Sequence, residues 1–202
     1  MHLRLLQPED HRLFTELMVQ AFCEDPLFVH LLGKPVPLQK ARALESFLFE
    51  KAFLMQEQVW GLLDQQDLLA AAVLSTPESN THLTLPLVIR TLNLLGPLGG
   101  RGLLHLNAYQ QKVLQNSPAV PHHYLIQIGV HPEQQGKGLG KTLLDRLWEE
   151  VCQHPTSQGL ALDTENAKNV SLYQHLSFKL TATTGLPPLH IHSLFRPRDA
   201  HA

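Results

Sequence analysis

Residues Gln135-Gly136-Lys137-Gly138-Leu139-Gly140 connect a strand-like run, His123 to Val130, to a helix-patterned run, Leu143 to Cys152. Glycines at such a junction let the backbone approach a ligand closely. The first turn of a helix also carries unpaired N–H groups at the positive end of its dipole, an arrangement that suits a phosphate. The sequence therefore predicts a binding site for a phosphate or pyrophosphate group at this junction.

Two common phosphate-binding patterns come close to these residues but do not fit. A Walker loop needs a glycine five positions before the Gly-Lys-Thr at 140–142, and that position holds Gln135. A dinucleotide fingerprint GxGxxG fails in both registers, since Lys141 or Leu143 stands where the third glycine belongs. Asp163, which ends a second strand-like run, does imitate the ribose-binding acid of the dinucleotide fold. A P-loop or dinucleotide-binding protein is therefore the weakest interpretation.

A third pattern, Gln/Arg-x-x-Gly-x-Gly/Ala, fits without adjustment as Gln135, Gly138 and Gly140. It resembles the coenzyme A pyrophosphate loop of the GCN5-related N-acetyltransferase (GNAT) superfamily. The likeness continues in the right order: residues 124–132 resemble the fourth strand of that family and the turn after it, and residues 160–166 resemble its fifth strand. The resemblance therefore extends well beyond one short motif.

Further segments strengthen this resemblance. The run Asn166-x-x-Asn169-x-x-Leu172-Tyr173-x-x-x-x-Phe178 resembles the helix and strand that close the coenzyme site. Within the superfamily, the chain is most similar to the puromycin N-acetyltransferase-like branch, which shares the look of Ala21-Phe22, Asp25-Pro26 and Thr76-Pro77-Glu78-Ser79. Ser177 stands where the family usually has glycine. Because serine tolerates most turn geometries, we expect little consequence there.

The order of the predicted elements indicates a mixed sheet with helices on both faces. Residues 59–63 and 68–75 read as a hairpin, and Asp25-Pro26 reads as the cap and first residue of a helix. The resemblance implies an α/β (α+β) fold, the GNAT fold, with a mixed central sheet of about seven strands whose fourth and fifth members splay apart. We expect residues 1–202 to form a single domain, with 81–118 as a helical insertion near the acceptor site.

The strand before the glycine loop is expected to lie against the coenzyme. Alternation predicts one face with Tyr124, Ile126, Ile128 and Val130 and another with Leu125 and Gln127. Gly129 is unusual in such a run and suggests a bulge or a ligand lying against the backbone. The resemblance implies the latter, a pantetheine arm hydrogen-bonded to the strand. The coenzyme-binding residues that it implies are Ile128, Gly129, Val130, Gln135, Gly136, Lys137, Gly138, Leu139, Gly140, Lys141, Asn166 and Asn169.

Acetyl transfer to an amine needs a neutral nucleophile, a polarised thioester carbonyl and a protonated leaving thiol. By resemblance, Tyr173 is the catalytic residue, a general acid whose hydroxyl faces the coenzyme sulfur. The general base cannot be assigned, because thirteen histidines offer many candidates; His123 and Glu165 are the best placed in the sequence. Glu24 and Asp25 carry charge that would attract an acceptor ammonium, although a helix cap explains Asp25 better. Asn166 is likewise a reasonable helix cap.

The composition is that of an ordinary soluble globule. The chain has 202 residues, with 16 Lys and Arg, 18 Asp and Glu and a formal net charge of −2, so nothing favours a nucleic-acid partner. Two cysteines form no disulfide framework and suit a reducing cytoplasm. Charges interrupt both the N-terminus and the apolar region 83–106, so we expect neither a secretion segment nor a membrane span. His190 and His192 share a strand face without a third ligand nearby, and we expect no metal site.

The favoured interpretation is an acetyl-CoA-dependent N-acetyltransferase that moves an acetyl group to a primary amine of a small molecule by direct attack on the thioester. Acetyl-CoA is then a co-substrate, and no metal, nucleic acid or membrane is required. A second class of protein stays open: a non-catalytic coenzyme A-binding regulatory or interaction domain on the same fold. The identity of the acceptor amine is open, and we expect a monomer or homodimer.

Overall fold

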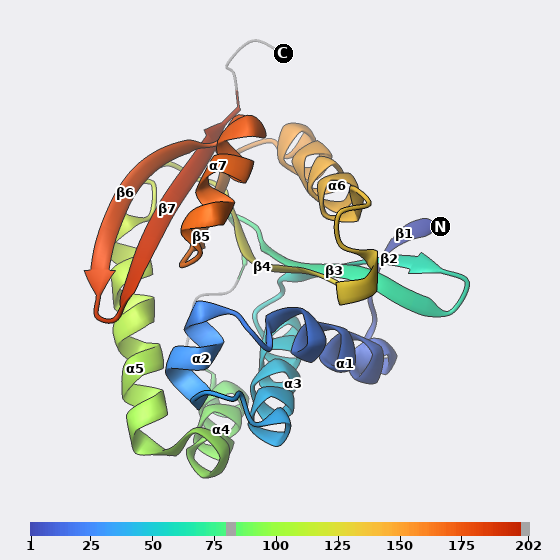
Figure 1. Cartoon of the computed structure of the whole chain (residues 1–202). Coiled ribbons are helices and arrows are strands. Elements are labelled where there is room, and N and C mark those ends of the chain that lie inside the picture. Colours follow the sequence, from blue (N-terminus) through green and yellow to red (C-terminus); the bar gives the residue numbers. More distant parts are fainter. Residues whose placement is uncertain (80–83, 199–202) are drawn as a thin grey trace.

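The computed structural model describes residues 1–79 and 84–198, which form a seven-stranded sheet with helices on both faces (Figure 1). The strand order is β1-β2-β3-β4-β5-β7-β6. The strands are β1 (His2–Leu5), β2 (Gln58–Asp64), β3 (Asp67–Ser75), β4 (His123–Val130), β5 (Gly159–Thr164), β6 (Lys179–Leu186) and β7 (Leu189–Pro197). The helices are η1 (Pro8–Asp10), α1 (His11–Phe22), α2 (Pro26–Leu32), α3 (Leu38–Leu54), α4 (Leu85–Asn93), α5 (Leu95–Asn116), η2 (Pro132–Gln134), α6 (Leu139–Gln153) and α7 (Ala167–His175).

The fold class expected from the sequence is confirmed, as is the hairpin of β2 and β3. Residues 81–83 of the expected helical insertion lie outside the described residues, and the remainder contains α4 and α5. A kink at Gly99 (φ 69°) interrupts α5 near its start. No helix within residues 1–79 and 84–198 is long and apolar enough to cross a bilayer.

The sheet opens between β4 and β5, its one parallel pair among the described strands. Pairing joins His123 to Leu160 and ends where Leu125 meets Leu162. Beyond that point β4 continues to Val130, still paired with β3, while β5 continues to Thr164, still paired with β7. The two strands therefore part in the middle of the sheet and leave a split between two well-supported halves.

A bulge in β4 changes which side chains face which layer. Val73 of β3 pairs with Gln127 and the next residue, Leu74, pairs with Leu125, so Ile126 is an extra residue in the ladder. The strict alternation predicted for this strand is therefore wrong. Leu125 packs in the core beneath α6 together with Ile128 and Val130, whereas Ile126, which alternation places on their face, packs in the core beneath α1 and α3.

Two apolar layers hold the sheet between its helices, which lie above and below it in Figure 1. On one face, Leu143 and Leu147 of α6 pack against Leu160 and Leu162 of β5. On the other face, the core includes Phe14, Leu17, Met18, Phe49, Ala52, Val59, Ala71 and Val73. Because each layer is fully buried, the position of the split between β4 and β5 is supported from both sides.

Candidate active site

The glycine loop has the backbone geometry that its composition predicts. Gly136 (φ 76°) and Gly138 (φ 80°) both lie in the left-handed region, where other L-residues are strained. A Cβ atom at either position would have no heavy atom within 4 Å, so the space next to both glycines is open. These glycines therefore serve the turn and leave room for a ligand against the backbone.

Helix α6 begins at Leu139, four residues earlier than its hydrophobic pattern predicts, so the last residues of the loop form its first turn. Its N-cap is Gly138, and no side chain within the described residues caps the turn. The N–H groups of Leu139, Gly140 and Lys141 therefore point out of the helix end without an intrahelical partner. Such an end favours an anionic group through both the N–H donors and the dipole.

The polar side chains of the loop bond to their neighbours. Gln135 donates from Nε2 to the carbonyl oxygen of Val130 at 3.2 Å and so ties the loop to the end of β4. Lys137 donates to Gln134 at 2.9 Å, and Lys141 pairs with Asp145 one turn further along α6 at 2.5 Å. Both lysine side chains are exposed, so they remain available to a phosphate at the helix end.

The residues expected along the coenzyme arm occupy the part of β4 that has separated from β5. Ile128 and Val130 pack partly against the α6 core. Gly129 is explained differently from its prediction: a Cβ there would lie 2.6 Å from Met18 Sδ and 3.1 Å from Ala21 Cβ on α1. The absence of a side chain thus allows α1 to pack closely, and the bulge lies at Ile126 instead. The edge of β4 that faces the split is a different surface from the face that packs against α1.

Helix α7 carries the predicted acid and both predicted amides. Asn166 is the N-cap, and its Oδ1 accepts from the Lys168 N–H at 3.1 Å. Asn169 donates to Thr164 Oγ1 at 3.5 Å, near the limit of a hydrogen bond. Tyr173 lies edge-on to Phe178 with ring centroids 5.6 Å apart. Burial, and then the charge of Glu165, raise the pKa of Tyr173 to about 12, so its hydroxyl is protonated at neutral pH.

Ser177, in the turn after α7, adopts a φ of 70°. This left-handed conformation costs a serine roughly 1 kcal/mol and a glycine almost nothing. Serine at this position therefore has an energetic cost that the sequence analysis did not expect. The turn itself forms, because the Phe178 N–H donates to the Tyr173 carbonyl oxygen at 3.1 Å.

A set of carboxyl groups and tyrosines lies on the side of the sheet away from α6, and most of it was not anticipated. Glu165 follows β5, and one of its oxygens has neither solvent contact nor a hydrogen-bond partner within the described residues. Burial raises the pKa of Glu165 to about 7, a hydrogen bond from Tyr109 of α5 lowers it, and the charge of Asp25 raises it. Of the two candidate bases, Glu165 is thus the one poised near neutral pH.

Glu45 of α3 is the deepest of these carboxyls and is fully buried. Gln127 of β4 donates from Nε2 to Glu45 Oε2 at 3.0 Å, while Oε1 has no partner within the described residues. Burial, with a contribution from Asp25, raises the pKa of Glu45 to about 8 despite that hydrogen bond. A sequence signal existed: Glu45 is spaced four residues from both Ala41 and Phe49, so it is a single charge on the apolar stripe of its helix.

Asp25 is the cap of α2, as the sequence predicts. Its Oδ1 accepts from the N–H groups of Leu27 at 2.9 Å and Phe28 at 3.3 Å, which confirms the helix cap. Burial nevertheless raises the pKa of Asp25 above its usual value. Its charge also raises the pKa values of Glu45 and Glu165, so these three carboxyls lie close enough to interact.

His123, the other candidate base, lies at the opposite end of β4 from the glycine loop. It is buried, its Nδ1 is 2.8 Å from Ser157 Oγ, and its ring packs edge-on against His154. Burial, and then the charge of His154, lower the pKa of His123 to about 4. Its surroundings are those of a structural side chain that stays neutral.

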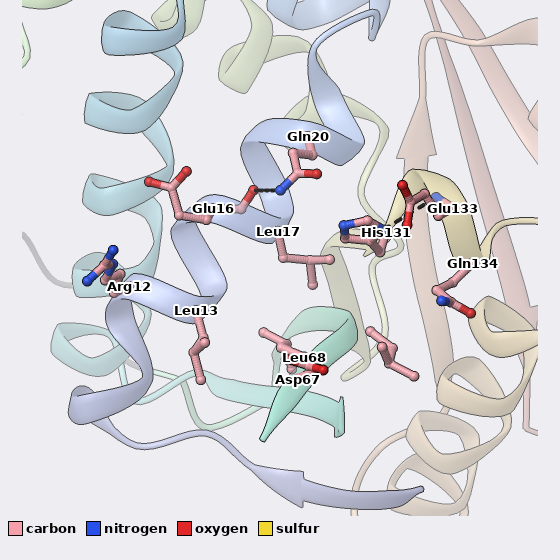
Figure 2. Close-up of a pocket in the computed structure, with 11 residues that line it drawn as sticks. Arg12, Leu13, Glu16, Leu17, Gln20, Asp67, Leu68, His131, Glu133 and Gln134 are labelled. Carbon is pink, nitrogen blue, oxygen red and sulfur yellow. Dashed lines mark hydrogen bonds between the residues drawn. The ribbon is translucent and has the colours of Figure 1, made fainter. Parts of the chain in front are cut away.

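A hollow of about 340 Å³ adjoins the beginning of the glycine loop (Figure 2). It lies between α1, the start of β3 and η2, and the Gln20 side chain donates to the Glu16 carbonyl oxygen along its wall at 3.3 Å. It is lined by Arg12, Leu13, Glu16, Leu17, Gln20, Asp67, Leu68, Leu69, His131, Glu133 and Gln134. No residue expected to bind coenzyme lines this hollow, so it is distinct from the split between β4 and β5.

Parts of this chain are similar in sequence to known proteins. Residues 96–178 match the model of the acetyltransferase (GNAT) family. Two curated relatives are 43% identical over 56 residues: L-methionine sulfoximine/L-methionine sulfone acetyltransferase of Salmonella typhimurium and L-amino acid N-acyltransferase MnaT of Escherichia coli. Each match covers 26% of this chain, and the chain spans only 32% and 31% of the length of these relatives.

Solved structures extend the likeness to the whole chain at the level of the fold. Histone acetyltransferase HPA2 and related acetyltransferase from Corynebacterium glutamicum gives a TM-score of 0.75 over 99% of this chain and 98% of its own, at 18% identity. YncA of Salmonella typhimurium, a putative acetyltransferase solved with its cofactor acetyl-CoA, gives 0.59 over 100% and 96%, also at 18% identity. The family match covers the glycine loop, α6, β5 and α7, and the fold of the whole chain is similar to the folds of these solved acetyltransferases.

Proposed function

We propose that this protein is an acetyl-CoA-dependent N-acetyltransferase that moves an acetyl group to a primary amine of a small molecule by direct attack on the thioester. One observation carries this proposal. The split between β4 and β5 has an uncapped helix end with open glycines on one side of the sheet and the carboxyl of Glu165 on the other, with Tyr173 on the helix that follows β5.

The residues around the split fit the coenzyme. The free N–H groups at the start of α6 suit a diphosphate, and the room beside Gly136 and Gly138 allows its oxygens to approach the backbone. Lys137 and Lys141 are exposed beside this helix end and add positive charge. Ile128 to Val130 present a strand edge without a β5 partner, which suits hydrogen bonds to the amides of a pantetheine arm. Bound acetyl-CoA supplies an activated acetyl thioester at this place.

The acceptor amine must lose a proton before it attacks. An alkyl ammonium with a pKa near ~10.4 needs roughly 4.6 kcal/mol to be neutral at pH 7. Glu165 is the base that we assign to this step, because its pKa of about 7 leaves much of it ionised at neutral pH. The oxygen of Glu165 that has no hydrogen-bond partner among residues 1–79 and 84–198 is the one that we assign to receive the proton. Tyr109, which donates to the carboxyl, orients it.

The leaving thiolate must gain a proton, and Tyr173 is the donor that we assign. Its raised pKa keeps the phenol protonated, so it can donate a hydrogen bond as negative charge grows on the sulfur. The same raised pKa makes full transfer uphill toward a thiolate of pKa ~8.5, so a rate contribution of only about ten- to hundredfold is expected. Tyr173 and Glu165 also interact electrostatically, which couples the two proton steps.

Two further features support a small acceptor. The matched curated relatives act on amino acids or amino-acid analogues, by their names. The likeness to the puromycin N-acetyltransferase-like branch in Ala21-Phe22 and Asp25-Pro26 points to a small primary amine as well. The expected insertion at 81–118 contributes Tyr109 to the surroundings of Glu165, which supports its proposed place near the acceptor.

A mass-spectrometric screen of primary amines with acetyl-CoA tests the function. We expect a mass increase of one acetyl group on at least one small amine, dependent on both protein and acetyl-CoA. Thermal unfolding with acetyl-CoA, ATP and NAD is measured beside it, since a ligand at 100 times its Kd stabilises by about 2.7 kcal/mol. Stabilisation by acetyl-CoA without transfer to any amine would favour the non-catalytic coenzyme-binding alternative, and stabilisation by ATP or NAD alone would contradict both.

A further inference from the structure

One side-chain oxygen of Glu45 has no hydrogen-bond partner within the described residues. Its side chain is fully buried, one oxygen is bonded to Gln127, and the other has no partner within the described residues. A buried carboxylate that lacks partners is costly, and proteins seldom keep one without a role. The apolar neighbours Leu44 and Phe49 on the same helix show that an apolar residue would pack at this level of the core.

The carboxyls around Glu45 add negative charge without compensation. Asp25 raises the pKa of both Glu45 and Glu165, and burial comes first among the causes of each shift. The groups that offset these shifts are an amide, a phenol and backbone N–H groups, and no lysine or arginine within the described residues is among them. Ionisation of Asp25, Glu45 and Glu165 is therefore costly in the free protein, and a cation bound between them would favour their ionised forms.

The cluster lies where an acceptor would meet the split. Glu165 follows directly after β5, Asp25 begins α2, and Gln127, which holds Glu45, belongs to β4 just past the bulge. Figure 1 shows α2 and α3 on the same side of the sheet, opposite α6. Asp25 and Glu165 are half-buried, and Glu45 lies deeper.

We propose that Asp25 and Glu45, held by Gln127, bind a second positive charge of the acceptor, so that the preferred substrate is a diamine or similar dication. This inference rests on the proposed acetyltransferase function, in which Glu165 receives the proton of the reacting amine. The second cation stays protonated and supplies the donor that Glu45 Oε1 lacks. One such hydrogen bond between the second ammonium and a buried carboxylate should strengthen diamine binding roughly ten- to hundredfold over that of a monoamine.

The test compares unbranched α,ω-diaminoalkanes of three to six carbons with the monoamines of the same length. We expect the kcat/KM of the best diamine to exceed that of its matched monoamine by about tenfold or more, beyond the twofold due to its two amino groups. In Glu45→Gln, the diamine value falls about tenfold while the monoamine value stays nearly unchanged. Asp25→Asn acts in the same direction, because asparagine keeps the helix cap and removes the charge.

Glu149→Gln is the matched control, because it removes one carboxylate from an exposed position of α6 on the other face of the sheet. It should leave the preference for diamines intact. Circular dichroism establishes that the variants are folded, and calorimetric titration of diamine and monoamine into the protein gives a readout without turnover. Glu45→Gln should reduce diamine binding there as well.

The outcomes separate this inference from the proposed function. Acetylation of monoamines and diamines with equal efficiency would overturn the second-charge site and leave the acetyltransferase intact. The second-charge site is also overturned if folded Glu45→Gln and Asp25→Asn both retain the wild-type preference. Failure to acetylate any amine would overturn the acetyltransferase function, and the inference with it.

Discussion

Tyr124 of β4 donates a hydrogen bond from its hydroxyl to Asp163 Oδ2 of β5 at 2.6 Å, across the place where the two strands separate. Ser193 of β7 donates to the other oxygen of the same carboxylate. Burial raises the pKa of Tyr124 and of Asp163, although both hydrogen bonds lower that of the acid. Asp163, which imitates a ribose-binding acid in the sequence, therefore has an internal partner for each oxygen and joins β4, β5 and β7 at the point where the split begins.

Removal of the Tyr124 hydroxyl should weaken this junction. In Tyr124→Phe, Asp163 Oδ2 loses its donor in a buried place, and we expect a loss of about 1–3 kcal/mol in the free energy of unfolding, measured by urea denaturation. Asp163→Asn in the same background should recover part of that loss, since a neutral amide is less costly to bury than an unpaired carboxylate. An unchanged midpoint in Tyr124→Phe would contradict the structural role.

Activity should rise with pH through the titration of Glu165. Its pKa is raised to about 7, and only the ionised carboxylate accepts a proton, so kcat/KM increases as pH rises from about 6 to 8. Glu165→Gln should lower kcat/KM by about 10² to 10⁴ and remove this limb of the profile, because the remaining rise belongs to the amine itself near pH ~10. A variant that keeps the limb near pH ~7 would exclude Glu165 as the base.

The control for that experiment is Glu133→Gln, an exposed carboxyl of η2 that lines the hollow beside α1. It should leave both the rate and the shape of the profile unchanged, because it is remote from the acid and base assigned to the reaction.

Tyr173→Phe should lower kcat by about ten- to hundredfold and leave the affinity for acetyl-CoA nearly unchanged. The phenol contributes a proton or hydrogen bond to the sulfur only as the thiolate leaves, whereas the ring itself still packs on Phe178 in the variant. Steady-state kinetics at saturating amine, with acetyl-CoA binding measured by calorimetry, separate the two quantities. Turnover equal to that of the wild type would remove Tyr173 from the mechanism.

Gly138→Ala should damage the coenzyme loop through its backbone. The φ of 80° costs an alanine about 1–2 kcal/mol, and the added methyl group occupies space proposed for the diphosphate, so we expect at least a tenfold higher Kd for acetyl-CoA. Gly96→Ala is the control, because Gly96 lies in helix α5 with equally open surroundings. It should leave binding unchanged and keep or slightly raise stability. Equal effects of the two substitutions on Kd would contradict the loop assignment.

Two variants of Asn166 separate its cap from its proposed contact with the pantetheine arm. Asn166→Ala removes the bond to the Lys168 N–H and should cost about 1 kcal/mol of stability. Asn166→Ser keeps a capping oxygen but has no amide NH₂ group. If that group binds the coenzyme, Asn166→Ser raises the KM for acetyl-CoA severalfold at nearly wild-type stability; an unchanged KM would leave only the cap.

Local patterns were sufficient for the features that local geometry controls. Gly136 and Gly138 stand where the backbone turns to positive φ, and Asp25 stands where α2 begins, because these conformations select glycine or a capping side chain within a few residues. Glu165 could be named as a candidate base from its place after β5, but its selection over His123 needed the surroundings of both side chains.

Distant contacts account for what local patterns missed. The extra residue at Ile126 arises from the register between β3 and β4, and it reverses the faces that alternation predicts. Gly129 is required by Met18, more than a hundred positions earlier.

Residues 135–140 were enough to predict a strand-to-helix junction with glycines at its turn, since that information lies within one continuous segment. The meeting of Asp25, Glu45 and Glu165 became visible only after α2, α3 and β5 had packed around the split. The physical reason is that burial and neighbouring charges change a carboxyl group, and both depend on residues brought together from across 140 positions of the chain.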